Sequence, residues 1–182
     1  MALNKKVLIL ECIPIKDARN EGVILNEFMQ LIYEDKVNLE RIKSKTDLIE
    51  RLKFNKYKYI HISSHGVCDE YGECYLETPN GLITTDEFDE TSGFKDRICF
   101  ISACSLGKKS FVETFWANAK PDILIAPQRE ITYVDAATFW ILLYYNHFYL
   151  KKTLFASYKI ASESVKNSGA MQYWYAEGYG DY

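Results

Sequence analysis

Short apolar runs recur along the chain, and each is about the length of a strand. They cover residues 7–10, 59–62, 98–101 and 123–126. None alternates cleanly between apolar and polar positions, which is typical of strands buried on both faces of a parallel sheet. A weaker strand is expected over residues 37–42. The runs therefore predict a mostly parallel sheet at the centre of the molecule.

Helical patterns separate these runs. The predicted helices are residues 23–33, 47–52, 111–119, 134–148 and 154–165. The longer ones repeat apolar residues every three or four positions, and Ser44 or Thr46 is expected to cap the short one. Alternation of strands and helices predicts an α/β fold, a three-layer sandwich around a mostly parallel, doubly wound sheet.

One insertion departs from this alternation. Residues 73–84 read as a hairpin with its turn at Pro79-Asn80-Gly81, and Thr84 with Glu87 forms a capping box for a short helix. We find no internal repeat, low-complexity stretch or linker, so residues 1–182 are expected to form a single domain.

Charge and composition exclude several classes of function. The formal net charge is −3 and no basic face stands out, which argues against a nucleic-acid binder. No signal peptide is visible and no apolar run is long enough to span a bilayer, so a cytoplasmic location without membrane attachment is the default. No glycine-rich phosphate loop follows a predicted strand, and no cofactor is expected.

Two reactive residues follow predicted strands. His65 comes after the strand that ends near Ser63, and Cys104 comes after the strand that ends near Ser102. The carboxyl ends of parallel strands share one edge of the sheet, and consecutive strands are usually neighbours, so the imidazole and the thiol are expected side by side. Cys104 also precedes a predicted helix, whose N-terminus would stabilise a thiolate. A histidine beside such a cysteine suits acyl transfer, with an oxyanion held by the amides of Gly66 and Cys104.

Two segments carry motifs around these residues. The first is YIHISSHG, residues 59–66, and the second is ICFISACSLG, residues 98–107. Together they resemble the signature blocks of caspase-like cysteine peptidases, and most closely those of the CHAT branch, which is related to the separases. The later stretch 123–148, with its long aromatic helix, also resembles the C-terminal half of CHAT domains. The resemblance covers residues 5–165 and implies a caspase-like fold.

The resemblance also implies roles for single residues. His65 would be the general base and acid, and Cys104 the nucleophile of an endopeptidase. Caspases select acidic side chains with basic residues, and Arg19 and Arg129 occupy comparable loops. Ser102 stands where caspases have glutamine, and Asp135 could instead select a basic side chain, so the cleavage specificity stays open.

The family context further implies control from outside the domain. An activating protein, a small signalling nucleotide or formation of a homodimer would switch the peptidase on, and bacterial relatives act in antiviral defence or cell death. Two other functions are weighed against this one. One is a catalytically silent, caspase-like binding or scaffold module, and the other is a nucleotide-sensing α/β domain.

The remaining cysteines and histidines are expected to be structural. Cys12 and Cys99 read as small core residues, and His61 and His147 as packed side chains. His61 and His65 with Cys68 and Cys74 could be taken for a zinc site, but their spacing matches no common zinc module, and no metal is expected. A disulfide between Cys68 and Cys74 is not expected in a cytoplasmic chain. The aromatic tail 171–182 is interpreted as an edge strand, with a partner surface as the alternative.

Overall fold

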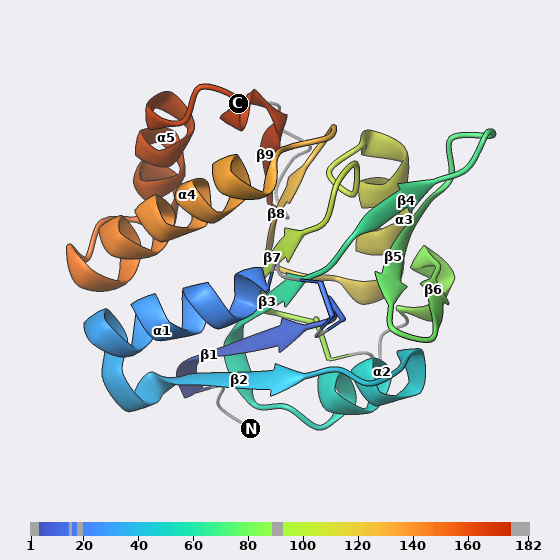
Figure 1. The fold of residues 1–182 in the computed structure, drawn as a ribbon, viewed down its shortest axis with the longest axis horizontal. Coiled ribbons are helices and arrows are strands. Elements are labelled where there is room, and N and C mark those ends of the chain that lie inside the picture. Colours follow the sequence, from blue (N-terminus) through green and yellow to red (C-terminus); the bar gives the residue numbers. More distant parts are fainter. Residues whose placement is uncertain (1–3, 15, 18–19, 89–92, 176–182) are drawn as a thin grey trace.

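A sheet of six strands forms the centre of the molecule (Figure 1). It is seen in a computed structural model that describes residues 4–14, 16–17, 20–88 and 93–175. The strand order is β2-β1-β3-β7-β8-β9, and all neighbours are parallel except β8 and β9. The strands are β1 (Asn4–Glu11), β2 (Val37–Arg41), β3 (Tyr57–Ser63), β7 (Ile98–Ser102), β8 (Ile123–Pro127) and β9 (Met171–Tyr175).

The apolar runs of the sequence are strands whose two faces are both buried. In β1, Val7 and Ile9 pack into one hydrophobic cluster, whereas Leu8 and Leu10 pack into another on the opposite face. All four side chains are almost completely buried. The run is continuous rather than alternating because neither face of the sheet meets water.

Helices cover both faces of the sheet, which confirms the predicted three-layer α/β sandwich (Figure 1). One face carries α1 (Glu21–Tyr33), α4 (Tyr133–Tyr144) and α5 (Leu154–Ser164), and the other carries α2 (Lys45–Lys53) and α3 (Lys109–Ala119). The helix predicted over residues 134–148 runs on from α4 as a π-helical segment, η3 (Tyr145–Tyr149). Short 3-10 turns are η1 (Glu34–Lys36), η2 (Thr85–Glu87) and η4 (Ser168–Ala170).

The predicted hairpin belongs to a second, antiparallel sheet. Its strands are β4 (Gly66–Cys68), β5 (Cys74–Thr78) and β6 (Gly81–Ile83), in that order. The hairpin is β5 with β6, and the capping box of Thr84 and Glu87 begins η2, both as expected. Strand β4 was not predicted, and it continues the chain directly from the β3 end.

The expectation that Cys68 and Cys74 stay unpaired is wrong. The antiparallel register of β4 and β5 sets these two residues opposite each other, and their sulfur atoms form a disulfide. Because both thiols form this bond, neither is available as a ligand in the zinc site considered above. The expectation had assumed a loop here, whereas a two-stranded ladder holds the two Cα atoms 4.0 Å apart.

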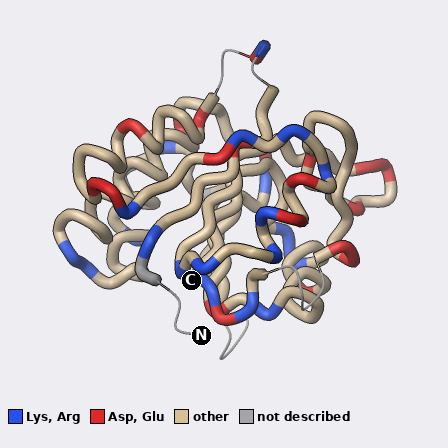
Figure 2. Tube along the Cα trace, turned by 90° about the horizontal axis from the view of Figure 1, so that it is seen from below, with Lys and Arg blue, Asp and Glu red and all other residues tan. Residues whose placement is uncertain are grey.

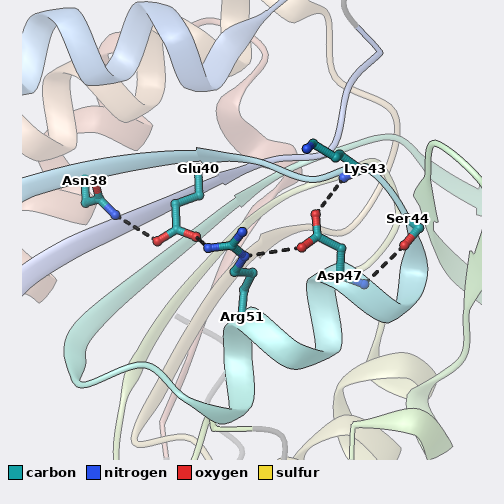
Figure 3. Close-up of polar contacts among 6 residues, drawn as sticks. All are labelled: Asn38, Glu40, Lys43, Ser44, Asp47 and Arg51. Atoms are coloured by element: carbon teal, nitrogen blue, oxygen red, sulfur yellow. Dashed lines mark hydrogen bonds and ion pairs between the residues drawn. The ribbon is translucent and has the colours of Figure 1, made fainter.

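Capping and ion pairing fix α2 against the edge strand β2 (Figure 3). The Ser44 hydroxyl accepts a hydrogen bond from the Asp47 amide at 3.2 Å, which confirms Ser44 as the N-cap. The Asp47 carboxylate in turn lies 3.2 Å from the Arg51 guanidinium, which reaches Glu40 on β2 at 2.7 Å. Arg51 thereby joins the helix to the strand.

The surface bears charges of both signs. Lys and Arg are mixed with Asp and Glu around the molecule, while the central strands are largely free of them (Figure 2). At the far edge, β9 pairs antiparallel with β8, which confirms an edge strand for the first part of the aromatic tail. Residues 176–182 of that tail lie outside the described residues. In the described chain, no helix is both long and apolar enough to cross a membrane.

Candidate active site

His65 and Cys104 follow two paired parallel strands. The register of β3 and β7 sets Ser63 beside Ser102, and the Ser64 amide extends the pairing by donating to the Ser102 carbonyl at 3.0 Å. His65 and Cys104 therefore each lie two residues after the paired residues Ser63 and Ser102. Both side chains line one cavity of about 190 Å³, the inner cavity, together with Ile13, Glu21, Ser64, Ser102, Ala103, Ile131, Tyr133 and Ala136.

Cys104 also lines a second cavity on its other side. This outer cavity has a volume of about 400 Å³ and includes Cys68 and Lys108 in its walls. The Lys108 ammonium lies 3.7 Å from the Cys68 sulfur of the disulfide. Cys104 thus borders both the inner cavity, which it shares with His65 and Glu21, and the outer cavity, which it shares with Cys68 and Lys108.

The turn that carries Cys104 is held by glycines on two sides. A Cβ atom added to Gly66 would lie 1.8 Å from the Cys104 carbonyl oxygen, and one added to Gly107 would lie 2.3 Å from the Ala126 carbonyl oxygen. The Gly107 amide also donates to the Pro127 carbonyl at 2.7 Å. Only glycine allows these approaches, which accounts for both glycines of the two motifs in packing terms.

The expectation that Cys104 sits at a helix N-terminus is wrong. Residues 104–107 form a turn, and α3 begins only at Lys109. Ser105 in this turn has φ of 67°, a left-handed conformation that is uncommon for a residue other than glycine. The Cys104 thiol contacts the Ile131 carbonyl oxygen at 3.8 Å. Proximity to the first turn of a helix therefore does not support a thiolate here.

His65 has a carboxylate beside it. Its Nε2 lies 3.5 Å from Oδ2 of Asp17, which belongs to the connection between β1 and α1. The side chains are about half and one-third exposed, 44% for His65 and 33% for Asp17. A carboxylate in this place can orient an imidazole. Sequence reasoning missed Asp17, because a single aspartate in a loop carries no motif.

Two buried glutamates lie behind the site. Glu11 ends β1, and its carboxylate accepts hydrogen bonds from the amides of Ile13 at 3.0 Å and Gly22 at 2.7 Å. Glu21 begins α1, is 3% exposed and lines the inner cavity. Burial raises the pKa of Glu11, and burial raises the pKa of Glu21 to about 8.

Glu21 is only partly satisfied by hydrogen bonds. Its Oε2 accepts from the Ser63 hydroxyl at 3.4 Å, whereas Oε1 has no hydrogen-bond partner among the described residues. The Tyr133 hydroxyl, in the same cavity, likewise lacks a partner in the described chain. Sequence reasoning missed both residues. An acid in the first turn of a helix usually needs no explanation beyond the helix dipole.

The four residues expected to bind substrate lie in different surroundings. Ser102 lines the inner cavity, and its hydroxyl accepts a hydrogen bond from the Trp140 indole at 2.9 Å. Arg129 lines a separate surface hollow with Asn167. Asp135 lies in the first turn of α4, where its carboxylate accepts hydrogen bonds from the hydroxyl of the N-cap Thr132 at 2.8 Å and from Asn167 at 2.9 Å, and these bonds lower its pKa. Arg19 lies outside the described residues.

The other histidines have packing partners. His61 is fully buried, its Nδ1 lies 2.6 Å from the Tyr144 hydroxyl, and burial lowers its pKa to about 3, so the ring is neutral. His147 bonds the Tyr59 hydroxyl and the Lys152 carbonyl through its two nitrogens. In the described part of the chain, no group of three or more His, Cys, Asp or Glu side chains is arranged to hold a metal ion.

Comparisons with known proteins find solved structures with a similar fold. No family model matches the sequence, and no curated protein does. Among solved structures, the Saccharomyces cerevisiae separase–securin complex matches with a TM-score of 0.64 over 93% of this chain, at 13% identity. The Arg-specific cysteine proteinase gingipain R matches with a TM-score of 0.59 over 91% of this chain, at 11% identity. This chain spans 11% of the first and 44% of the second.

Proposed function

We propose that this chain is a cysteine endopeptidase, with Cys104 as the nucleophile and His65 as the general base and acid. It has the caspase-like α/β fold that it shares with two structures of cysteine peptidases. The observation that carries the proposal is that the thiol and the imidazole emerge from neighbouring parallel strands into one cavity. That edge of a parallel sheet is where such folds place their chemistry.

The proposed reaction uses groups of this chain alone. His65 faces Asp17 with Nε2, so its other nitrogen would take the proton of the Cys104 thiol. The thiolate then adds to the carbonyl carbon of the substrate, and the oxyanion would be held by the amides of Gly66 and Cys104. Collapse forms a thioester and expels the amine, which receives the proton from His65. Water, deprotonated by His65, hydrolyses the thioester and regenerates the thiol.

The wider setting in the proposal rests on the sequence resemblance. It comprises a single CHAT-type peptidase domain over residues 1–182, a cytoplasmic location, and activation by a protein or a small signalling nucleotide, with defence or cell death as the context. The separase structure was crystallised with the protein securin, which supports a protein partner in general terms. The Cys68–Cys74 disulfide weighs against the cytoplasmic part of this setting, because disulfides persist mainly in oxidising compartments.

A thiol-reactive peptide probe tests the nucleophile directly. Cys104 is half-buried at two cavities, whereas burial raises the pKa of the free thiols Cys12 and Cys99. We expect mass spectrometry to find the probe on Cys104 and to find Cys12 and Cys99 unmodified. His65→Ala should slow this labelling by about a hundredfold or more.

Cleavage of a substrate distinguishes an enzyme from a catalytically silent binding module. Cleavage of a protein substrate by the wild-type chain should be abolished in both Cys104→Ala and His65→Ala, while circular dichroism and thermal melting show the fold intact. Activity that survives both substitutions would end the proposal. Selective labelling of Cys104 without any cleavage would favour the caspase-like binding module instead.

A further inference from the structure

Three cysteines lie together beside the small sheet. Cys68 and Cys104 both line the outer cavity, and the Cys74 sulfur is bonded to that of Cys68. The backbones that carry them are in contact, because a Cβ atom added to Gly66, two residues before Cys68, would lie 1.8 Å from the Cys104 carbonyl oxygen. A free thiol and a disulfide therefore border one space of about 400 Å³.

The other two cysteines are kept away from this disulfide. Cys12 and Cys99 are 2% and 0% exposed in the hydrophobic core, and burial raises the pKa of both thiols. Exchange with a disulfide requires a thiolate and access to the sulfur that it attacks. Among the described cysteines, Cys104 is therefore the free thiol placed to react with the disulfide.

The two halves of the disulfide border different hollows. Cys68 is partly exposed and lines the outer cavity, whereas Cys74 is 7% exposed and lines a separate hollow against α3. A thiolate displaces a disulfide sulfur from the side opposite the sulfur that leaves. Attack from the outer cavity therefore falls on Cys68 and expels Cys74.

A lysine contacts the sulfur that would be attacked. The Lys108 ammonium lies 3.7 Å from the Cys68 sulfur, and Lys108 lines the outer cavity together with Cys104. During exchange the negative charge of the thiolate spreads over three sulfur atoms, and an ammonium in this place stabilises that charge. Glu130 brings the opposite charge to the same cavity, so the support depends on the direct contact of the ammonium with sulfur.

We propose that Cys68–Cys74 is a redox-active disulfide that exchanges with Cys104 and so masks this thiol reversibly. The Cys104 thiol releases its proton to solvent, and its thiolate forms a bond to the Cys68 sulfur. The Cys68–Cys74 bond breaks with its electron pair on Cys74, which takes up a proton. One thiol and one disulfide remain, so the step consumes no oxidant or reductant. The inference goes beyond the proposed peptidase function, because the exchange needs no turnover.

Peptide mapping without reductant tests the exchange. The chain is held at about pH 8, where thiols are partly ionised, then quenched with acid, unfolded and treated with N-ethylmaleimide, which marks free thiols. We expect a Cys68–Cys104 crosslink and a marked Cys74 in about a tenth or more of the wild-type chains. In Cys104→Ser, which also measures scrambling by the core cysteines, Cys74 should stay unmarked. Equal marking of Cys74 in the two chains would overturn the inference.

The direction of attack and the role of Lys108 are tested with glutathione. In Cys104→Ser, glutathione should form its mixed disulfide with Cys68 and free Cys74. Adding Lys108→Gln should slow this reaction about fivefold, the effect of one ion pair near the surface. The matched control is Lys109→Gln at the next, exposed position, where the ammonium pairs with Glu113 at 3.8 Å, and it should keep the rate. Glutathione on Cys74, or equal rates in the two lysine variants, would contradict the proposed attack.

A measurement on Cys104 itself keeps the two proposals separable. The reductant tris(2-carboxyethyl)phosphine should raise the share of wild-type chains in which iodoacetamide modifies Cys104, by the share that carried the crosslink. It should change nothing in Cys68→Ser combined with Cys74→Ser, which cannot form the crosslink. A crosslink in a chain that cleaves no substrate would support the inference and refute the peptidase. Cleavage by a chain that never forms the crosslink would refute the inference and leave the peptidase proposal standing.

Discussion

The two cavities on either side of Cys104 are built differently. The inner one lies against the main sheet and α1, and its distinctive groups are the buried Glu21 carboxyl, which accepts a hydrogen bond from Ser63, and the Tyr133 hydroxyl, which has no hydrogen-bond partner in the described chain. The outer one is bounded by β4 and carries a lysine beside a disulfide. The inner cavity is thus bordered by buried polar side chains, whereas the outer cavity has a disulfide in its wall.

The largest expected effect comes from Gly66, which packs against the turn of Cys104, a residue that lines both cavities. Gly66→Ala would place a Cβ atom 1.8 Å from the Cys104 carbonyl oxygen, so the nucleophile's turn would have to move. We expect kcat/KM to fall by about a thousandfold or more, because misplacement by about 1 Å already costs about a hundredfold. Steady-state kinetics measures the loss.

The matched control is Gly72→Ala in the turn between β4 and β5. A Cβ atom there meets nothing within 4 Å, and only its positive φ of 85° adds strain, about 1 kcal/mol. Activity of this variant should stay near the wild-type value. A Gly66→Ala variant as active as the Gly72→Ala variant would contradict the close approach.

Removal of the disulfide should affect only the outer region. Cys68→Ser combined with Cys74→Ser opens a crosslink between residues six positions apart and should lower the free energy of unfolding by about 2 kcal/mol, the value chain entropy gives for so short a loop. Urea denaturation measures this. Cleavage of a protein substrate should survive, and its loss would show that the two cavities are not independent.

Substitution of Asp17 tests whether its carboxylate orients the imidazole of His65. Asp17→Asn removes the charge 3.5 Å from Nε2 of His65, and we expect kcat to fall about tenfold with little change in KM. The pH profile of kcat should change as well, which a merely structural role would not require. An unchanged profile and rate would mean that His65 is oriented by other contacts.

The smallest effect concerns pH and the buried acid. Folding raises the pKa of Glu21 to about 8 from 4.5, so above pH 4.5 the folded chain holds a proton that the unfolded chain has released. The stability that this group contributes is present below pH 4.5 and is lost as the pH rises toward 8. Glu21→Gln, which cannot titrate, should therefore become more stable relative to the wild-type chain as the pH rises from 5 to 8. Denaturation at the two pH values measures the difference, and Glu27→Gln, the same change at an exposed position of α1, should show none.

The sequence allowed the two reactive residues to be paired for a simple reason. Runs buried on both faces indicate parallel strands, and parallel strands share their carboxyl edge, so His65 and Cys104 had to approach each other if their strands were neighbours. Glu21 could not be found in this way. Its burial depends on how α1 packs over the ends of β1 and β3, which is a property of three segments and not of one.

The disulfide was missed for a related reason. Cys68 looked like a loop residue because β4 is only three residues long and lacks a hydrophobic pattern. The pairing of β4 with β5 sets the register of the two strands, and the sequence of so short a strand does not predict that pairing. The helix after Cys104 lies where its apolar pattern predicted it, as α3, but a turn that the contact of Gly107 with β8 stabilises separates its first residue from Cys104.

The glycine contacts on both sides of the Cys104 turn also limit how the dyad can be assembled. The turn cannot shift without displacing β4 or the end of β8, whereas the thiol faces the Ile131 carbonyl and the imidazole faces Asp17. If the proposed dyad forms, the packed backbone leaves side-chain rotation as the motion that brings sulfur and nitrogen together, and such rotations take on the order of nanoseconds.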